Sequence, residues 1–495
     1  MITPLLPACT DLPVWRCAGI RTLETQLQAQ SAQPLMDLAG LATARLAMAV
    51  APHARQIWIA AGPGNNGGDG LEAAMHLQQW GKRVQVCLLG DVTQQPADAR
   101  RARERARQAG VPVHMGLSAS PPELDERDLW IDALLGIGAC RPPEGALLQA
   151  IDRINASQAT VLAVDLPTGL DADSGQPLGE PQAMVRAGHT LTFLGSKPGL
   201  FMGHGRDACG RIWLAPLGWP ADTRIGCPPD AELNPPATPM PRSHASHKGS
   251  HGDVAIVGGE CLNSASMGGA AVLAAQGALH GGAGRVLLCL LGQTDLAPAA
   301  PPDLMRRDLD ALELPRLTVV AGCGGGQAIA APLGRLLQHS ARLVLDADAL
   351  NCVAQDAWMQ RLLTERAARR HPTVLTPHPL EAARLLGVDT AQVQSDRIEA
   401  ARQLAERFDC CVVLKGSGTV IAAPGHLPRI NTTGNGLLAT GGTGDVLAGL
   451  IGARLARMAD GWSAACSSVW EHGFVADRWP AGRTLTASGL AASLR

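Results

Sequence analysis

The stretch NTTGNGLLATGGTGDVL, residues 431–447, decides the fold of the C-terminal half of this chain. Its glycines at 441–444 lead into Asp445, and the apolar residues at 446–451 have helical spacing. A helix that starts here points its unpaired N–H groups and its positive dipole end at whatever lies in front. A phosphate on the Gly442 to Gly444 backbone would lie beside Asp445, which could accept a proton from an attacking hydroxyl. An ordinary helix-start acid explains a lone GTGD equally well.

The composition favours small-molecule chemistry. The chain has 495 residues, enough for two or three domains that each bury a core. Because 46% of its residues are hydrophobic and its formal net charge is −2, we expect neither disorder nor a nucleic-acid or anionic-membrane partner. The cysteines are scattered without a CxxC pair, which favours reduced thiols over a disulfide framework or a zinc ribbon. With no signal-peptide pattern and no apolar run of roughly 20 residues, a cytoplasmic location is expected.

The N-terminal half alternates strands and helices. Apolar strands are expected at 56–61, 83–89, 129–134 and 160–165, and helices at 34–50, 71–80, 97–109 and 144–154. This alternation predicts a parallel, doubly wound α/β sheet. Ligands of such sheets bind at the carboxyl ends of the strands. Three polar turns fall there, at 65–69, 132–142 and 165–171, and we expect them to converge.

A linker separates this half from a second α/β domain. Seven prolines lie among small and polar residues at 220–241, without periodicity. After them we expect strands at 253–257, 285–290, 317–321, 342–346, 373–376, 411–414 and 419–422, and a helix at about 264–280. The two halves share no alignable motif, so they are two different domains.

The turn GPGNNGGDG, residues 62–70, allows more than one interpretation. It matches GxGxxG between a strand and a helix, and Asp91 follows the next strand, so a Rossmann dinucleotide site is one of them. Asp69, however, places a negative charge where that motif holds a pyrophosphate. The side-chain oxygens suit a hard cation or substrate hydroxyls better, with Asp132 and Thr168 completing an oxygen cage. Plain turn formation remains a further alternative, also for 165–171.

Seven motifs, taken in chain order, carry a family resemblance. They are GPGNNGGDG at 62–70, VDLPTGLD at 164–171, HKGSHGDV at 247–254, LDADAL at 345–350, TPHPLEAARLL at 376–386, LKGSGTV at 414–420 and NTTGNGLLATGGTGDVLAGLI at 431–451. Together they resemble the bifunctional NAD(P)H-hydrate repair enzymes. The resemblance implies a Rossmann-like epimerase domain at 1–222, a linker at 223–242 and a ribokinase-like, ADP- or ATP-dependent dehydratase domain at 243–495.

The resemblance implies that the first domain interconverts the R and S forms of hydrated NADH and NADPH, with K⁺ in its site. It implies K⁺ ligands at Asn66, Asp132 and Thr168, the last where serine is usual. Asp165 is the expected acid or base. Implied substrate contacts are Asn65, Asn66, Gly67, Gly68, Asp69, Gly136, Ile137, Gly138, Ala139, Cys140, Arg141, Pro142 and Asp165.

For the second domain the resemblance implies phosphorylation of the hydrate's 6-hydroxyl by a nucleotide, followed by loss of phosphate. Asp445 would be the base, and the Gly442 to Gly444 amides would hold the phosphoryl group. Implied hydrate contacts are Ala270, Gly326, His378 and Asp445. Implied nucleotide contacts are Lys415, Gly416, Ser417, Gly418, Thr419 and Gly444. Mg²⁺ is expected with the nucleotide, and homo-oligomeric assembly is implied. The family usually has a proline-glycine pair where this chain reads AGCGGG at 321–326, so the match to the family is weakest at Gly326.

Other functions remain as alternatives. Lys415 alone could be a solvated strand-end charge and His378 a core or turn histidine. The spacing of His244, His247 and His251 resembles a zinc site that lacks a fourth ligand. The whole chain could be a ribokinase-like kinase of a small metabolite fused to a binding module, although it has no GxxxxGK[ST] motif. It could also be a non-catalytic NAD-binding scaffold.

Overall fold

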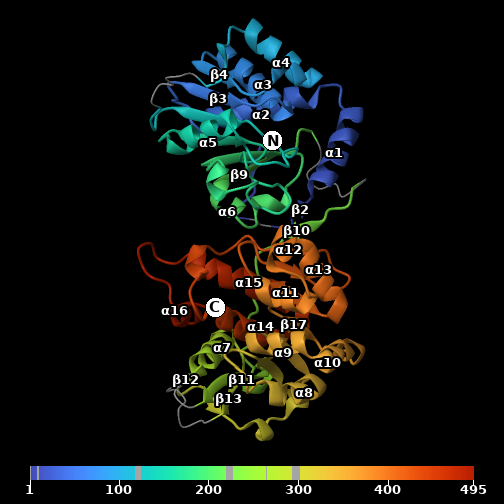
Figure 1. Cartoon of the computed structure of the whole chain (residues 1–495). Helices are drawn as coiled ribbons and strands as arrows, with labels where there is room; N and C mark the ends of the chain where they lie inside the picture. Colours follow the sequence, from blue (N-terminus) through green and yellow to red (C-terminus); the bar gives the residue numbers. More distant parts are fainter. Residues whose placement is uncertain are drawn as a thin grey trace. The chain divides into compact units, whose positions relative to one another are not determined.

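The computed structural model describes residues 2–7, 10–117, 124–218, 227–262, 265–292 and 301–494. The chain divides into two compact units, which we call the N-terminal unit (Met1–Pro7 and Leu12–Ala231) and the C-terminal unit (Ala8–Asp11 and Glu232–Arg495) (Figure 1). The division falls inside the stretch expected to be a linker, of which residues 223–226 lie outside the described part. No helix among the described residues is both long and apolar enough to cross a membrane.

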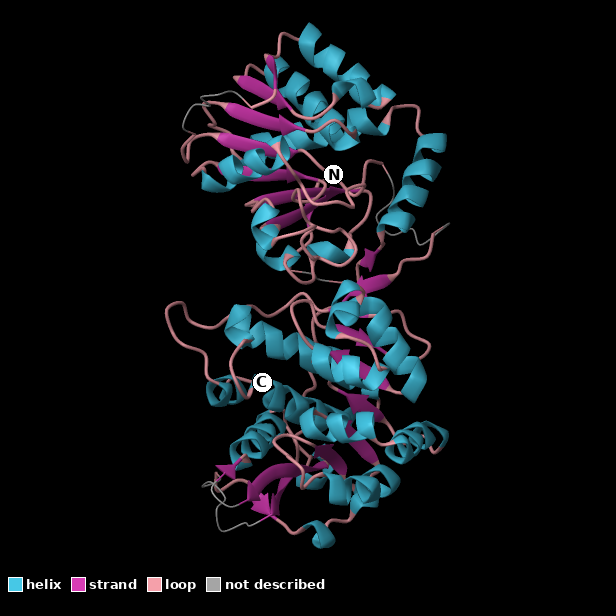
Figure 2. Ribbon diagram, viewed as in Figure 1, coloured by secondary structure: helices cyan, strands magenta, loops and turns pink. Residues whose placement is uncertain are grey.

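The N-terminal unit is built on one sheet with the strand order β1-β9-β8-β7-β6-β3-β4-β5 (Figure 2). All neighbours are parallel except β1 and β9. The strands are β1 (Thr3–Pro4), β3 (Ile57–Ala61), β4 (Val84–Leu88), β5 (Val113–Met115), β6 (Leu129–Ala133), β7 (Thr160–Val164), β8 (His189–Phe193) and β9 (Arg211–Ala215); β2 (Pro13–Val14) lies before the first helix. The predicted doubly wound α/β sheet is confirmed.

Hydrophobic cores lie on both faces of this sheet because side chains alternate along a strand. In β3, Ile57 and Ile59 belong to the core that includes the residues of the first four helices, while Trp58 and Ala60 belong to the core that includes Ile151. The helices are α1 (Cys17–Gln30), α2 (Leu35–Val50), α3 (Asn65–Gln79), α4 (Ala97–Gln108), α5 (Ala146–Ala156) and α6 (Gly205–Ala208).

The start of α3 corrects the sequence prediction. Residues 62–70 were expected to form a turn before a helix at 71, but α3 already begins at Asn65. The glycines have no Cβ, and this lets the first turns of the helix pack closely against the sheet and the preceding loop. A Cβ on Gly70 would lie 2.5 Å from the Ala133 side chain, and one on Gly67 would lie 1.9 Å from the Gly62 carbonyl oxygen. The polar residues 65–69 therefore form the first turns of a helix.

The C-terminal unit has a mixed sheet in which β14-β13-β11-β15-β16-β17-β18-β19-β20-β10 are neighbours. Strands β13 to β18 run parallel along this order, β19 is antiparallel to both of its neighbours, and β12 adds to β11. The strands are β10 (Ala231–Leu233), β11 (Asp253–Leu262), β12 (Ala265–Ser266), β13 (Arg285–Gly292), β14 (Met305–Arg306), β15 (Thr318–Ala321), β16 (Arg342–Leu345), β17 (Thr373–Leu375), β18 (Cys411–Leu414), β19 (Val420–Ala422) and β20 (Arg429–Ile430). The predicted α/β class is confirmed here too.

Helix α14 packs on one face of this sheet, beside α7 and α15. It crosses α7 with almost no gap, since a Cβ on Gly449 would stand 1.8 Å from the Ala274 carbonyl oxygen. This close packing fixes the position of the α14 N-terminus. The helices are α7 (Gly268–His280), α8 (Ala330–His339), α9 (Ala347–Gln355), α10 (Ala357–Ala368), α11 (Pro379–Leu386), α12 (Thr390–Ser395), α13 (Arg397–Phe408), α14 (Thr443–Met458), α15 (Gly461–Asp477) and α16 (Ala487–Ala492).

Candidate active sites

The polar turns of the N-terminal unit meet at one cavity of about 800 Å³. Of the residues predicted to contact a substrate, the cavity is lined by Asn65, Asn66, Asp69, Gly136, Ile137, Gly138, Ala139, Cys140, Arg141, Pro142 and Asp165. Gly67 and Gly68 are buried behind it and do not line it. The expected convergence of the strand ends is therefore seen.

Asp165 lies at this cavity, directly after β7, in a left-handed conformation with φ +68°. Its Oδ1 accepts a hydrogen bond from the Lys197 ammonium at 2.6 Å and others from Thr192 Oγ1 and the Phe193 N–H, each at 3.3 Å. Lys197 is fully buried and also donates to the Thr192 hydroxyl and the Phe193 carbonyl. Neither Lys197 nor β8, the strand that precedes it, was predicted from the sequence.

Asn66, Asp132 and Thr168, the expected K⁺ ligands, are all buried. Asp132 Oδ1 accepts from Thr168 Oγ1 at 2.7 Å, and its Oδ2 accepts from the Thr168 N–H at 2.8 Å. Burial raises the pKa of Asp132 to about 6, against the lowering effect of these Thr168 bonds and of the Leu134 N–H. The amide oxygen and nitrogen of Asn66 are buried without a hydrogen-bond partner among the described residues. An unsatisfied amide oxygen and a buried carboxylate fit a cation site.

Carboxylates crowd the same cavity. Burial raises the pKa of Asp69 well above its ordinary value, and the charges of Asp165, Glu24 and Glu72 raise it further. A pyrophosphate at the start of α3 would add negative charge to this cluster. The geometry therefore disfavours the Rossmann dinucleotide alternative. Asp91 is exposed and caps a short turn by accepting from the Thr93 N–H at 2.9 Å.

In the C-terminal unit, α14 begins at Thr443, after Gly442 in a left-handed conformation with φ +92°. Thr443 Oγ1 donates to the carbonyl oxygens of Leu438 and Thr440. Burial lowers the pKa of His472 to about 4, although its bond with the Thr443 carbonyl opposes this. The ring is thus neutral near pH 7, and its Nε2–H donates to that carbonyl at 2.9 Å. These bonds hold the first turn, which carries Asp445.

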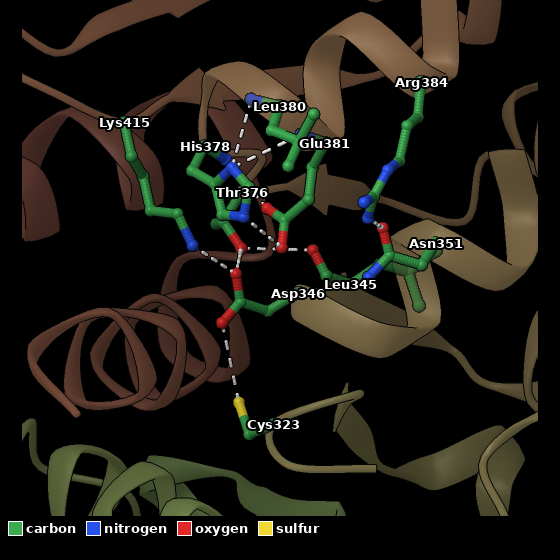
Figure 3. A network of polar contacts seen from close by, with 10 residues as sticks. All are labelled: Cys323, Leu345, Asp346, Asn351, Thr376, His378, Leu380, Glu381, Arg384 and Lys415. Carbon is green, nitrogen blue, oxygen red and sulfur yellow. Dashed lines mark hydrogen bonds and ion pairs between the residues drawn. The ribbon is translucent and has the colours of Figure 1, made fainter. Parts of the chain in front are cut away.

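A polar network around Asp346 includes Lys415 and Thr376 (Figure 3). Lys415 Nζ and Thr376 Oγ1 both donate to Asp346 Oδ1, at 2.6 and 2.7 Å. Burial alone would lower the pKa of Lys415, but the Asp346 and Glu381 carboxylates outweigh it and raise the pKa. The ammonium therefore stays charged. It lies beside the first turn of α14, because its Nζ is 3.5 Å from the position that a Gly444 Cβ would occupy. A cation at a helix N-terminus forms an anion site.

Asp445 lies in this network, half-buried. One carboxylate oxygen of Asp445, one of Asp346 and the Cys323 sulfur all lie within 4.8 Å of one another. Burial raises the pKa of Asp445 to about 7, as does the Asp346 charge, while the Cys323 hydrogen bond and Lys415 lower it. A carboxylate with a pKa near the working pH is suited to general-base catalysis.

A role for Asp445 as general base predicts a pH dependence that follows from this pKa. A base acts in its deprotonated form, so kcat/KM should rise about tenfold per pH unit below 7 and level off above it. We expect a pH profile of turnover at this site to show this rise. Glu381, whose pKa burial also raises to about 7, offers a matched control: Glu381→Gln should keep the profile. A flat profile in the unmodified protein would contradict the assignment.

The loop expected to bind the nucleotide starts at Lys415. Gly416 has φ +139°, and its carbonyl accepts from Thr419 Oγ1 at 3.0 Å. Gly416 and Ser417 are exposed, whereas Gly418 is buried and Thr419 half-buried. Arg397, which the sequence analysis missed, donates from below to the Leu414 and Lys415 carbonyls. Lys415, the first residue of this loop, lies beside Gly444 in the first turn of α14.

Besides Asp445, the three other residues expected at the hydrate site lie around the same network. Ala270 is half-buried in the first turn of α7. The Gly326 N–H donates to Asp348 Oδ2 at 2.8 Å, and the Glu260 carboxylate fills the space where a Cβ would stand. His378 caps α11, because its Nδ1 accepts from the Leu380 and Glu381 N–H groups. Its Nε2 lies 3.2 Å from Glu381 Oε1.

The histidines at 244–251 do not form a metal cluster. Within the described part of the chain, Cys323, Asp346 and Asp445 are the one group of three ligand-type residues close enough to share an ion. His251 instead bonds to Ser246 Oγ at 3.0 Å. The zinc alternative is therefore not supported.

Comparison with known proteins gives matches over both units. A family model described as YjeF-related protein N-terminus matches residues 32–199, and one described as NAD(P)H-hydrate dehydratase matches residues 254–494. The latter falls on the half predicted to be ribokinase-like. A crystal structure of an ADP/ATP-dependent NAD(P)H-hydrate dehydratase from Bacillus subtilis, co-crystallised with ATP and Mg²⁺, is 30% identical, covers 52% of this chain and 92% of that chain, and has a TM-score of 0.44.

Curated relatives match along nearly the whole chain. The bifunctional NAD(P)H-hydrate repair enzyme Nnr of Escherichia coli (strain K12) is 36% identical over 490 residues, 95% of this chain and 90% of that protein. The Nnr protein of Coxiella burnetii is 35% identical over 90% of both chains. Together with the two family models, these matches place the chain in the family of bifunctional NAD(P)H-hydrate repair enzymes.

Proposed function

We propose that this protein repairs hydrated NADH and NADPH by two reactions. The epimerase activity belongs to residues 1–222 and a nucleotide-dependent dehydratase activity to residues 243–495, joined by the linker at 223–242. The observation that supports the proposal best is Asp445, which lies at the start of α14 beside the Lys415 ammonium and has a pKa raised to about 7.

In the proposed epimerisation, the substrate's reduced ring binds in the cavity of the N-terminal unit. Asp165 faces that cavity and exchanges a proton with the ring or its hydroxyl. Lys197 holds the Asp165 carboxylate through its contact with Oδ1, which leaves Oδ2 to accept a proton. The backbone of residues 136–142 and the side chains of Asn65 and Asp69 line the remaining wall.

In the proposed dehydration, the S-hydrate's 6-hydroxyl attacks the terminal phosphorus of ADP or ATP. Asp445 accepts the hydroxyl proton, and the bond to the nucleotide's leaving oxygen breaks, which releases AMP from ADP. The amides of Gly442 to Gly444 and the Lys415 ammonium stabilise the charge on the transferring phosphoryl group. Phosphate then leaves C6 with the bonding electrons, a proton is lost from C5, and the dihydronicotinamide double bond forms. Mg²⁺ bound with the nucleotide would neutralise phosphate charge.

The test is to incubate the full chain with hydrated NADH and ADP. Recovery of the absorbance of the reduced nicotinamide is expected, and mixed R and S hydrates should be consumed completely because one unit epimerises what the other dehydrates. Half-consumption would contradict the epimerase assignment. No recovery with either ADP or ATP would contradict the dehydratase assignment.

We propose that K⁺ is held by Asn66, Asp132 and Thr168, where it would keep the buried Asp132 carboxylate ionised. A cation that binds only the folded state stabilises it. Replacing K⁺ by Li⁺ at constant ionic strength is therefore expected to lower the melting temperature of the N-terminal unit by a few degrees and the epimerisation rate about tenfold.

The matched variant for this measurement is Asn66→Ala, which removes the unsatisfied amide oxygen. In Asn66→Ala the difference between the two salts should largely disappear. Equal melting temperatures of the unmodified protein in K⁺ and Li⁺ would show that no K⁺ site exists there. Calorimetry follows the unfolding and a coupled absorbance assay follows the rate.

A further inference from the structure

A second large cavity lies in the C-terminal unit, away from the network around Asp445. Its volume is about 1090 Å³. It is lined by the chain at 237–242, the end of α7 with the two glycines that follow it, the C-terminal half of α14, the segment from α15 to residue 483, and residues 493–494. None of the residues assigned above to the hydrate, the nucleotide or K⁺ lines it. A cavity of this size holds a ligand as large as a nucleotide.

The lining of this cavity is strongly cationic. Five arginines contribute to it, namely Arg242, Arg454, Arg457, Arg478 and Arg483. Glu471 is the one carboxylate among the residues that line it, and it is paired with Arg454. The remaining positive charge attracts an anion.

Arg242 and Arg457 converge at one point of the wall. Arg242 Nη2 and Arg457 Nη1 each lie 3.3 Å from the position that a Gly282 Cβ would occupy. Arg242 donates to the Gly282 carbonyl at 2.8 Å and Arg457 to the Met240 carbonyl at 3.1 Å. Neither guanidinium pairs with a carboxylate among the described residues. Burial lowers the pKa of Arg457, and the charges of Arg242 and Arg454 lower it further. A bound anion would relieve this repulsion.

An aromatic wall adjoins the arginines. The rings of Trp470 and Phe474 stack with centroids 4.6 Å apart and planes at 17°. Arg478 lies over the Phe474 ring at 5.6 Å. The Trp479 indole N–H is buried and has no hydrogen-bond partner among the described residues. Such a wall offers a stacking surface to a planar ring.

We propose that this cavity is a second binding site for a phosphate-bearing ligand with a planar ring, of the nucleoside monophosphate class. Paired guanidinium groups bind phosphate oxygens in a fork geometry, and the aromatic wall takes the ring. Arg457 lies twelve residues after Asp445 on α14, or about 18 Å along the helix axis. The site is therefore separate from the proposed catalytic one, and only the Lys415→Ala background of its test rests on the proposed function.

The experiment is titration calorimetry of the full chain with AMP, adenosine and inorganic phosphate as probes. The Lys415→Ala background removes the nucleotide site proposed above. In this background one AMP per chain is expected to bind, with adenosine and phosphate each at least tenfold weaker. Adding Arg242→Gln and Arg457→Gln should weaken AMP at least tenfold, whereas the exposed pair Arg316→Gln and Arg361→Gln should leave it unchanged.

Three results would overturn the proposal. They are no AMP bound to Lys415→Ala, AMP binding unchanged by loss of both arginines, or phosphate bound as tightly as AMP. If the double arginine variant melts at a lower temperature, the exposed Arg478 provides a variant that leaves the fold intact. Arg478→Gln should weaken AMP several-fold without changing the melting temperature, and unchanged AMP affinity in this variant would count equally against the proposal.

Discussion

Asp445→Asn is expected to lower nucleotide-dependent dehydration about 10³-fold, because the amide cannot accept the hydroxyl proton. Epimerisation should be unchanged, since Asp445 lies in the other unit. The measurement is recovery of the reduced nicotinamide from pure S-hydrate, beside epimerisation of the R-hydrate followed by chromatography. The exposed Asp310 provides the control: Asp310→Asn should keep both rates. An Asp445→Asn variant with more than a tenth of the original dehydration rate would remove Asp445 from the mechanism.

The same substitution should stabilise the fold at neutral and higher pH. Asp445 has a pKa of about 7 in the folded chain, above its ordinary value of 3.8. Below both values the carboxyl group is protonated in the folded and in the unfolded state, so it does not change the free energy of unfolding. As the pH rises from the lower to the higher value, the unfolded state ionises first and stability is lost. Asparagine avoids this loss, so Asp445→Asn should raise the free energy of unfolding by up to about 4 kcal/mol at pH 8 and hardly at pH 3.

Asp165→Asn is expected to lower epimerisation by about 10²- to 10⁴-fold, because it removes the one carboxylate oxygen free to exchange a proton. Asparagine tolerates the left-handed backbone at this position, so the turn itself should survive. The change leaves the buried Lys197 ammonium without its counter-charge, which should destabilise the N-terminal unit by about 3 to 5 kcal/mol. Epimerisation of R-hydrate and denaturant unfolding measure the two effects.

Lys197→Met separates chemistry from stability at this site. It removes the positive charge but leaves the Asp165 carboxylate facing the cavity. If Asp165 reacts directly and Lys197 only positions it, Lys197→Met should lose less activity than Asp165→Asn at similar stability. The double variant should be more stable than either single one, since no unpaired buried charge remains. Activity retained by Asp165→Asn would contradict the role given to Asp165.

Local patterns predicted the α/β class, many of the strands and the helix that carries Asp445. The strand at 56–61 and the helix after Gly442 were readable because apolar period and glycine position act over a few residues. The start of α3 was not, because the glycines at 67 and 70 look like turn residues until the sheet packed against them is known. Close packing between distant elements leaves no trace in a short window.

The residues proposed for the sites could be named from the sequence, but their electrostatics could not. Lys415 and Asp346 are 69 residues apart, and their ion pair exists only because β16 and β18 both end at this edge of the sheet. The same holds for Lys197 beneath Asp165 and for His472 beneath the first turn of α14. Each partner looks like an ordinary core or surface residue in the sequence, so burial and charge had to come from the structure.

The central claim is that the C-terminal unit transfers a phosphoryl group to the hydrate and then eliminates it. The most direct measurement counts the products of one turnover of S-hydrate with excess ADP. We predict one AMP, one inorganic phosphate and one reduced nicotinamide for each hydrate consumed. A phosphorylated hydrate that accumulates without reduced nicotinamide would contradict the account and identify the unit as a small-metabolite kinase.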